Sequence, residues 1–445
     1  MPNQQLQSEI QPSRVHEILS RHLLVDGFDL VADLRRSRGA RIYDSRGDRT
    51  YLDFFTFFAS SPIGLNHPAL TTPEFIERIG RAAVNKPSNS DVYTVEMAEF
   101  VDTFSRIAVP DYLPHAFFVS GGALAVENAL KTAFDWKVRK NFAKGHTFER
   151  GHQVIHFRQA FHGRSGYTLS LTNTDEVKTK YFPKFSWPRI DNPAIHFPLD
   201  EQSIEEVEGR EQAALDAVKK AIHDNPDDIA AIIIEPIQGE GGDNHFRKEF
   251  FQGLRDIADE EDVLLIFDEV QTGLGLTGRL WAHEWFVEPD IMAFGKKMQV
   301  CGILAGRRID EVEENVFNVS SRINSTWGGN LVDMVRASQY LKVIHEENLV
   351  SNAERVGAYL LEKLHALASD FPGIVSNVRG RGLFCAFDLP GGKERDRLRK
   401  AIMGRGLLIL GCGEKSIRFR PPLNVTTEEI DEGVGIVRDA LSEDI

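Results

Sequence analysis

The chain has 445 residues, of which 42% are hydrophobic, and its formal net charge at pH 7 is −14. This length predicts two or three domains, and the acidic balance without a basic run argues against nucleic acid as a partner. Three scattered cysteines, a beginning unlike a signal peptide and no apolar run of about 20 residues predict a cytoplasmic protein that does not enter a membrane.

The first part of the chain predicts small elements. Short helical pieces are expected up to about residue 35, and residues 41–43 and 50–54 flank a turn and predict a hairpin. The segment 54–58 is unusually aromatic, and a packed aromatic cluster is one interpretation of it. Asn66-His67-Pro68 then opens a helical region.

A glycine pair follows the next apolar strand. That strand begins at Phe117 and runs through Gly121 and Gly122 into a helix predicted for residues 124–140. Strand, glycine pair and helix together form a cup for phosphate, because free backbone N–H groups and the positive helix end point at the anion. An ordinary helix start capped by Ser120 is the alternative interpretation.

Apolar strands alternate with helices through the middle of the chain, which predicts a mostly parallel α/β sheet. The strands are expected at residues 154–157, 229–235, 263–267 and 291–294, and the helices at residues 203–223 and 246–262. Residues 181–198 are rich in proline and aromatic residues and predict a long loop.

Two of these strands end at candidate catalytic residues, Asp268 and Lys296, which lie 28 residues apart. Short apolar runs that end in polar residues are typical of buried parallel strands, and ligands bind beyond the carboxyl ends of such strands. A lysine amine can form a Schiff base with an aldehyde while a carboxylate pairs with a protonated ring nitrogen, which is how proteins hold pyridoxal phosphate. Solvated charges at two strand ends are the alternative interpretation.

A competing motif follows Asp268 and Glu269. Gly273-Leu-Gly275-Leu-Thr-Gly278 fits the dinucleotide-binding pattern G-x-G-x-x-G directly after a strand. The two carboxylates before it would repel a pyrophosphate. A dinucleotide-binding oxidoreductase is therefore kept as a second hypothesis of a different class.

The composition changes after residue 330 and predicts a smaller α+β unit. Helices are expected at residues 331–345 and 351–368, and strands near residues 382–387 and 407–410. Thr426 and Glu429 have the spacing of a capping box for a last helix.

The chain from about Tyr51 to its end resembles the class III (omega) aminotransferases, which are pyridoxal phosphate enzymes of fold type I. The matching motifs are F-D-E-V-Q-T-G, P-D-I and G-K. The resemblance implies a homodimer, and a large domain with a mostly parallel seven-stranded sheet beside a smaller α+β domain. It places an N-terminal segment at residues 1–70, the large cofactor-binding domain at 71–330 and the small domain at 331–445.

The resemblance also assigns residues to the cofactor: Gly122 and Ala123 to the phosphate, Phe161 to stacking on the ring, Asp268 to the ring nitrogen, Gln271 to the ring hydroxyl, Lys296 to the Schiff base and Thr326 to the phosphate of the other subunit. Gly121 stands where the family usually has Ser or Thr. Lys296 is chosen over Lys297 because it directly follows a small residue, Gly295, at the family's distance after Pro-Asp. The family also places segment 54–58 beside the partner's active site.

Two substrates are implied for one pocket. In the family, an arginine at the Arg164 position binds a substrate carboxylate, and Glu240 and Arg418 resemble a gate that opens for the second carboxylate of 2-oxoglutarate or L-glutamate. The wording of the stretches that begin at Phe161, Gly239 and Asn324 favours L-lysine as the amino donor, with Asn324 near its α-amine. Ornithine and 4-aminobutyrate remain alternative donors.

Overall fold

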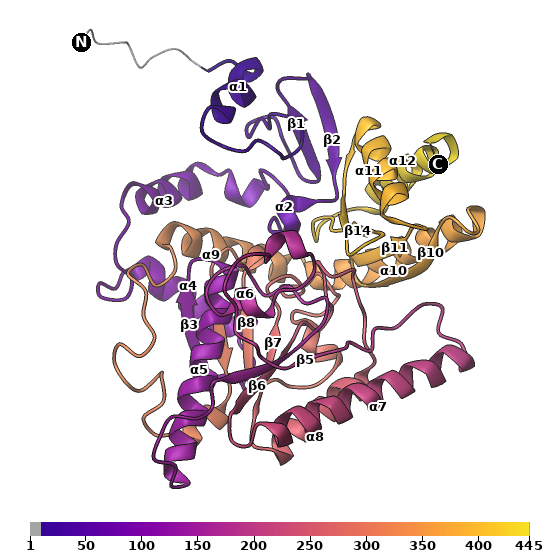
Figure 1. Cartoon of the computed structure of the whole chain (residues 1–445). Coiled ribbons are helices and arrows are strands. Elements are labelled where there is room, and N and C mark those ends of the chain that lie inside the picture. The colour runs from indigo at the N-terminus through magenta and orange to yellow at the C-terminus, as the bar shows by residue number, and fades with distance from the viewer. Residues whose placement is uncertain (1–9, 445) are drawn as a thin grey trace.

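A computed structural model of the chain describes residues 10–444, and its centre is a seven-stranded sheet (Figure 1). The strands lie in the order β3-β9-β8-β7-β6-β4-β5, and all neighbours are parallel except the two pairs that contain β9. The bounds are β3 (His115–Val119), β4 (Gln153–Phe157), β5 (Arg189–Ile190), β6 (Ile229–Ile234), β7 (Leu264–Asp268), β8 (Ile291–Phe294) and β9 (Cys301–Ala305). The predicted mostly parallel seven-stranded sheet is confirmed.

Helices cover both faces of this sheet, which explains why its strands are apolar without interruption. In β6, Ala231 and Ile233 pack with α5 (Gly122–Ala143) on one face, whereas Ile232 and Ile234 pack with α7 (Glu201–Asp224) and α8 (Lys248–Glu260) on the other. Figure 1 shows α5 apart from α7 and α8, with the strands between them.

A third layer of helices packs beside β3 and β9. It contains α3 (Pro73–Val84), α4 (Val95–Ala108) and α9 (Leu331–Glu346), and α9 lies against both other helices. Their apolar side chains form one core with Phe294 and Leu304 of the sheet.

The C-terminal part forms its own sheet. The strands β10 (Ser376–Arg381), β11 (Phe384–Asp388), β14 (Ser416–Phe419) and β13 (Leu410–Cys412) pair antiparallel in that order, and α10 (Leu349–Asp370), α11 (Gly392–Gly404) and α12 (Thr427–Asp444) accompany them. The sequence did not predict β10. The capping box of α12 is confirmed, since the backbone N–H of Glu429 donates to Thr426 Oγ1 and that of Thr426 donates to Glu429 Oε2.

The predicted N-terminal hairpin is β1 (Arg41–Asp44) with β2 (Arg49–Asp53), and it follows the short helix α1 (Val15–Ser20). The strand predicted near 407–410 is two strands in the structure. β12 (Leu407–Leu408) pairs parallel with β2 of the N-terminal hairpin, whereas β13 pairs with β14 in the C-terminal sheet. The two ends of the chain therefore share a three-stranded sheet. The domain boundaries at residues 70 and 330 stay a prediction.

Two short helices complete the fold, α2 (Thr56–Ala59) and α6 (Thr168–Leu171). The long loop predicted for 181–198 contains the two-residue strand β5, which is too short to leave a pattern in the sequence. Among the described residues, no helix has both the length and the apolar character that crossing a membrane requires.

Candidate active site

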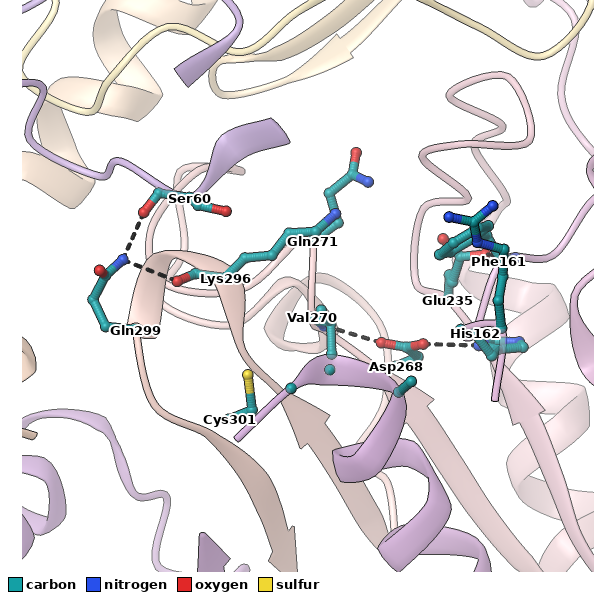
Figure 2. A pocket seen from close by; sticks show the side chains of 15 residues that line it. Ser60, Phe161, His162, Glu235, Asp268, Val270, Gln271, Lys296, Gln299 and Cys301 are labelled. Atoms are coloured by element: carbon teal, nitrogen blue, oxygen red, sulfur yellow. Dashed lines mark hydrogen bonds and ion pairs between the residues drawn. The ribbon is translucent and has the colours of Figure 1, made fainter. Parts of the chain in front are cut away.

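A cavity of about 600 Å³ lies at the carboxyl ends of β4, β6, β7 and β8 (Figure 2). Parallel strands bring their following loops to one edge of a sheet, so residues far apart in sequence meet there. Seven residues singled out in the sequence line this cavity: Gly122, Ala123, Phe161, Arg164, Asp268, Gln271 and Lys296.

The glycine pair forms the cavity wall at the start of α5. Gly121 is the residue before the helix, has φ +116° and gives the helix no side-chain cap. The alternative in which Ser120 caps the helix is therefore wrong. A Cβ on Gly122 would lie 2.9 Å from Val270 Cγ1, so a larger residue would crowd this wall. Uncapped backbone N–H groups at a helix start, lining a cavity, are suited to an anion.

Asp268 is buried and holds two hydrogen bonds. Its Oδ2 lies 2.8 Å from His162 Nδ1, and its Oδ1 accepts from the backbone N–H of Val270 at 3.0 Å (Figure 2). Burial lowers the pKa of His162, but the hydrogen bond and charge of Asp268, with the charge of Glu235, outweigh burial and raise it. The geometry and charge therefore fix this carboxylate at the cavity floor.

Glu235 directly follows β6 and lies near this pair. Burial raises its pKa to about 7, with the charge of His162 opposing that rise and the charge of Asp268 adding to it. Its oxygens accept from the backbone N–H groups of Phe161 at 2.9 Å and Gly239 at 3.2 Å. Glu235 thus ties two loops of the cavity together.

Glu269 points away from the cavity although it directly follows Asp268. It is 1% exposed, and its carboxylate accepts from the backbone N–H groups of Ala282 and His283. Its Oε1 also lies 2.7 Å from His283 Nδ1. The second acid of this motif is therefore a structural anchor for residues 281–283.

The G-x-G-x-x-G segment does not form a dinucleotide site. Residues 270–277 form turns, and the next helical element is the short 3-10 helix Ala282–Trp285 and not the α-helix that a dinucleotide site needs. A Cβ on Gly273 would lie 2.5 Å from the Trp281 ring, and one on Gly278 would lie 3.0 Å from Glu354 Cβ. The glycines serve close packing against the protein itself, so the second hypothesis is wrong.

The two neighbouring lysines differ in their surroundings. Lys296 lines the cavity, and burial first and then the positive charge of Arg418 lower its pKa to about 8. Lys297 Nζ instead donates to the backbone oxygen of Gln271 at 2.6 Å, and burial lowers its pKa well below the ordinary value. A Cβ on Gly295 would lie 2.8 Å from Cys301 Sγ, which explains the small residue before Lys296.

Gln271 is held by an arginine that the sequence did not single out. Its Oε1 accepts from Arg420 Nε at 3.3 Å and Nη2 at 3.1 Å, and Arg420 Nη2 lies 2.5 Å from Asp243 Oδ1. The guanidinium carbon also lies 3.3 Å from the centroid of the Phe384 ring. These contacts orient Gln271 from the C-terminal part of the chain.

Two arginines could receive substrate carboxylates. Arg164 is exposed at the cavity, and within residues 10–444 it forms no ion pair, so its guanidinium is available to a ligand. Arg418 is 3% exposed, and its Nη1 lies 3.0 Å from Glu240 Oε2. Lys178 Nζ donates to the other oxygen of Glu240 at 2.7 Å.

Thr326 and Asn324 are not brought to the cavity of their own chain. Both are exposed, and neither lines it. Their neighbour Ser325 is fixed, because its backbone oxygen accepts from Ser90 Oγ. The neighbouring Trp327 is 43% exposed and lies under Lys86, with 3.7 Å from Nζ to the ring centroid.

Sequence reasoning missed several residues of the cavity: Ser60, His162, Glu235, Gln299 and Cys301. His162 is the second residue of the stretch that begins at Phe161, but nothing in its spacing pointed to Asp268. Gln299 Nε2 donates to the backbone oxygens of Ser60 at 2.7 Å and Lys296 at 3.1 Å, so it fixes the turn after β8. Among the described residues, no group of three or more His, Cys, Asp and Glu side chains is placed to hold a metal ion.

A buried lysine, a buried acid and an uncapped helix start meet at the ends of parallel strands, as in pyridoxal phosphate transferases. The chain belongs to the class III aminotransferases, whose family model matches residues 26–441. It is 56% identical over 432 residues to an L-lysine-epsilon aminotransferase of Mycobacterium tuberculosis, covering 97% of this chain and 96% of the relative. It is 52% identical over 423 residues to that of Amycolatopsis lactamdurans, covering 94% of each.

A solved structure agrees with these matches. The lysine aminotransferase from M. tuberculosis in the internal aldimine form superposes with a TM-score of 0.95 at 56% identity, covering 97% of this chain and 99% of that one. The chain is a pyridoxal phosphate enzyme like the rest of its family.

The cavity fits this cofactor. The start of α5 offers N–H groups for the phosphate, Asp268 offers a buried carboxylate for the ring nitrogen, and Lys296 offers an amine. Gly121 has a φ that disfavours side chains, which explains why it lacks the hydroxyl usual in the family. Any further contact to the phosphate must come from another residue.

Prediction for the lysine. We expect the purified protein to be yellow and borohydride to fix the cofactor covalently to Lys296, because Lys296 faces the cavity while Lys297 Nζ donates to the backbone. Peptide mapping by mass spectrometry locates the label. Lys297→Met should still be labelled at Lys296, and Lys296→Ala should take no label. A label on Lys297 in the unaltered protein would contradict the assignment.

Proposed function

We propose that this chain transfers the terminal (ε) amino group of L-lysine to 2-oxoglutarate, giving 2-aminoadipate 6-semialdehyde and L-glutamate. The ion pair between Glu240 and Arg418 carries the proposal, although neither residue is among those that line the cavity. An arginine that can exchange one carboxylate for another would let one site accept two differently charged substrates. The two relatives described above, at 56% and 52% identity, are both named for lysine, which also supports it.

Lys296 is the proposed catalytic base. When bound, pyridoxal phosphate supplies an electron sink that stabilises negative charge at the substrate carbon. Asp268, held by its hydrogen bond with His162, would place its carboxyl group at the ring nitrogen. Once its amine is free, Lys296 moves a proton to and from the substrate carbon, and its pKa of about 8 makes the neutral amine available near pH 8.

Lysine would enter with its terminal amine toward Lys296. Arg164, which is exposed in the cavity wall, would bind the α-carboxylate through its planar fork. Glu240 would stay on Arg418, so the apolar chain of lysine passes a neutral pair. Asn324 would contact the α-amine from the other subunit, since it lies outside the cavity of its own chain.

2-Oxoglutarate would enter with its keto group toward Lys296 and carries two carboxylates. Its α-carboxylate would replace Glu240 on Arg418, and its side-chain carboxylate would take Arg164. A buried arginine without a partner is costly, so the exchange of one carboxylate for another keeps Arg418 paired in both half-reactions.

Prediction for the amino donor. Single-turnover spectroscopy with lysine, ornithine and 4-aminobutyrate should show fastest conversion by lysine. Ornithine is one methylene shorter, so we expect it to react at least about tenfold more slowly. Equal or faster conversion by ornithine or 4-aminobutyrate would contradict lysine as the donor and favour those alternatives.

Prediction for the gate. Glu240→Ala should slow the lysine half-reaction by roughly a hundredfold, because removing one partner of a buried pair costs about 3 kcal/mol. The glutamate half-reaction should change little or improve, because Arg418 is then free for its α-carboxylate. Single-turnover rates of each half-reaction measure the difference. Equal losses in both would make Glu240 a structural residue.

The proposed assembly is a homodimer with shared active sites. Exposed apolar side chains accompany Thr326 and the segment 54–58: Phe57 is 39% exposed, Phe58 53% and Trp327 43%. Thr326 would then reach the cofactor phosphate of the partner. We also retain the cytoplasm as the expected location, on the grounds of composition.

Prediction for the dimer. Mixing Lys296→Ala with Thr326→Ala should restore part of the activity, because a heterodimer contains one site in which both residues are unaltered. The exchange of subunits is checked by differently tagged chains, and two Lys296→Ala samples serve as the control. A fully active monomer in sedimentation would contradict shared sites.

A further inference from the structure

Glu240 is shared by two cations. Its Oε2 lies 3.0 Å from Arg418 Nη1, and its Oε1 accepts from Lys178 Nζ at 2.7 Å. Lys178 ends a short 3-10 helix at Glu176–Lys178, far in sequence from Arg418 on β14. One carboxylate therefore links the loop after α6 to the C-terminal sheet.

The two cations differ in burial. Arg418 is 3% exposed in its side chain, whereas Lys178 is 22% exposed and Glu240 28%. Lys178 Nζ also donates to Thr174 Oγ1 at 3.2 Å and lies 5.5 Å from the centroid of the Phe161 ring, which lines the cavity. Lys178 is therefore held beside the active site while its side chain stays partly exposed.

The second cation on Glu240 affects how easily the pair of Glu240 and Arg418 opens. A carboxylate that already bonds one cation is less firmly committed to a second, so Lys178 weakens the hold of Glu240 on Arg418. When a substrate carboxylate takes Arg418, Glu240 would be a poorly solvated anion without a partner, which is unfavourable. Lys178 offers that partner with no further movement of its own.

We propose that Lys178 is a positioning residue that receives Glu240 when Arg418 releases it, and so tunes the enzyme toward dicarboxylate substrates. The inference rests on the proposed gate at Glu240 and Arg418. The substrate that Lys178 would favour is a dicarboxylate of five carbons, because its second carboxylate has to replace Glu240 on Arg418. A monocarboxylate with a long apolar chain does not need that exchange.

Substitution of Lys178 should therefore separate the two substrates. In Lys178→Met, Glu240 keeps only Arg418, and we expect KM for 2-oxoglutarate to rise about threefold to tenfold, the range between an exposed pair and a charged hydrogen bond. The kcat and the lysine half-reaction should stay within about twofold. Lys178→Arg should restore most of the KM, because it keeps the charge.

Equilibrium binding tests the same point without turnover. Calorimetry of the holoenzyme with glutarate should show a Kd raised about threefold to tenfold in Lys178→Met, and hexanoate should bind as in the unaltered protein. Lys180→Met is the matched control, since Lys180 lies two residues away and is exposed. Within residues 10–444 its side chain has one interaction, with the Tyr181 ring at 5.1 Å from Nζ to the centroid. It should leave both affinities unchanged.

A double-mutant cycle shows whether Lys178 acts through Glu240. In a Glu240→Gln background, Lys178→Met should no longer change glutarate affinity. The inference is wrong if Lys178→Met weakens glutarate and hexanoate equally, if it changes neither, or if its effect persists without Glu240.

The test stays separate from the choice of amino donor. If the unaltered protein does not convert lysine, the proposed function fails, and glutarate affinity still decides the role of Lys178. If Glu240→Gln leaves glutarate affinity unchanged, the gate and the inference fail together.

Discussion

The buried pair between Asp268 and His162 is the interaction on which the site depends. Both side chains are almost fully enclosed, at 5% and 0% exposure, and their atoms lie 2.8 Å apart. Taking such charges out of water is costly unless each satisfies the other. The pair is possible here because β7 ends at Asp268 while the loop after β4 brings His162 across β6 to meet it. The strand order thus brings the two side chains within hydrogen-bond distance, and their interaction makes the burial of both acceptable.

Neighbouring residues of the same type have opposite roles at two places. Asp268 faces the cavity and Glu269 anchors a loop, and Lys296 lines the cavity while Lys297 donates to the backbone. At the end of β7 successive side chains point to opposite sides, so Asp268 enters the site and Glu269 does not. Lys296 and Lys297 instead lie in a 3-10 turn in which Lys296 has φ +48°, and this turn sends their amines to different partners. The second residue still has a function, since Glu269 holds the backbone of Ala282 and His283 and Lys297 holds that of Gln271.

The sequence predicted the elements whose signal is local and missed those whose signal is not. The apolar run of β7 and the capping box at Thr426 depend on neighbours in the chain, and both were predicted. The strands β5 and β10 were missed, because the first has two residues and the second, S-N-V-R-G-R, is polar. Their pairing comes from the surrounding sheet.

The site shows the same limit. Spacing alone suggested Asp268 and Lys296, because both end apolar strands, but Arg418 and Glu240 were named only through a family resemblance. Nothing in the sequence pointed to Arg420, which orients Gln271 from the far end of the chain. Pairs between charges that are distant in sequence leave no periodic pattern, so the fold has to be known before they can be seen.

Charge sharing gives a reason for the arrangement around Arg418. A fully buried one-to-one pair of Glu240 and Arg418 would be difficult to open, because either ion left alone is strongly disfavoured. Here Glu240 is 28% exposed and already holds Lys178, while Arg418 is nearly enclosed. Glu240 therefore has a second ion-pair partner and some exposure, whereas within residues 10–444 the nearly enclosed Arg418 has its ion pair with Glu240. In the proposed gate, such an asymmetric pair would favour movement of the carboxylate and keep the arginine in place for a substrate carboxylate.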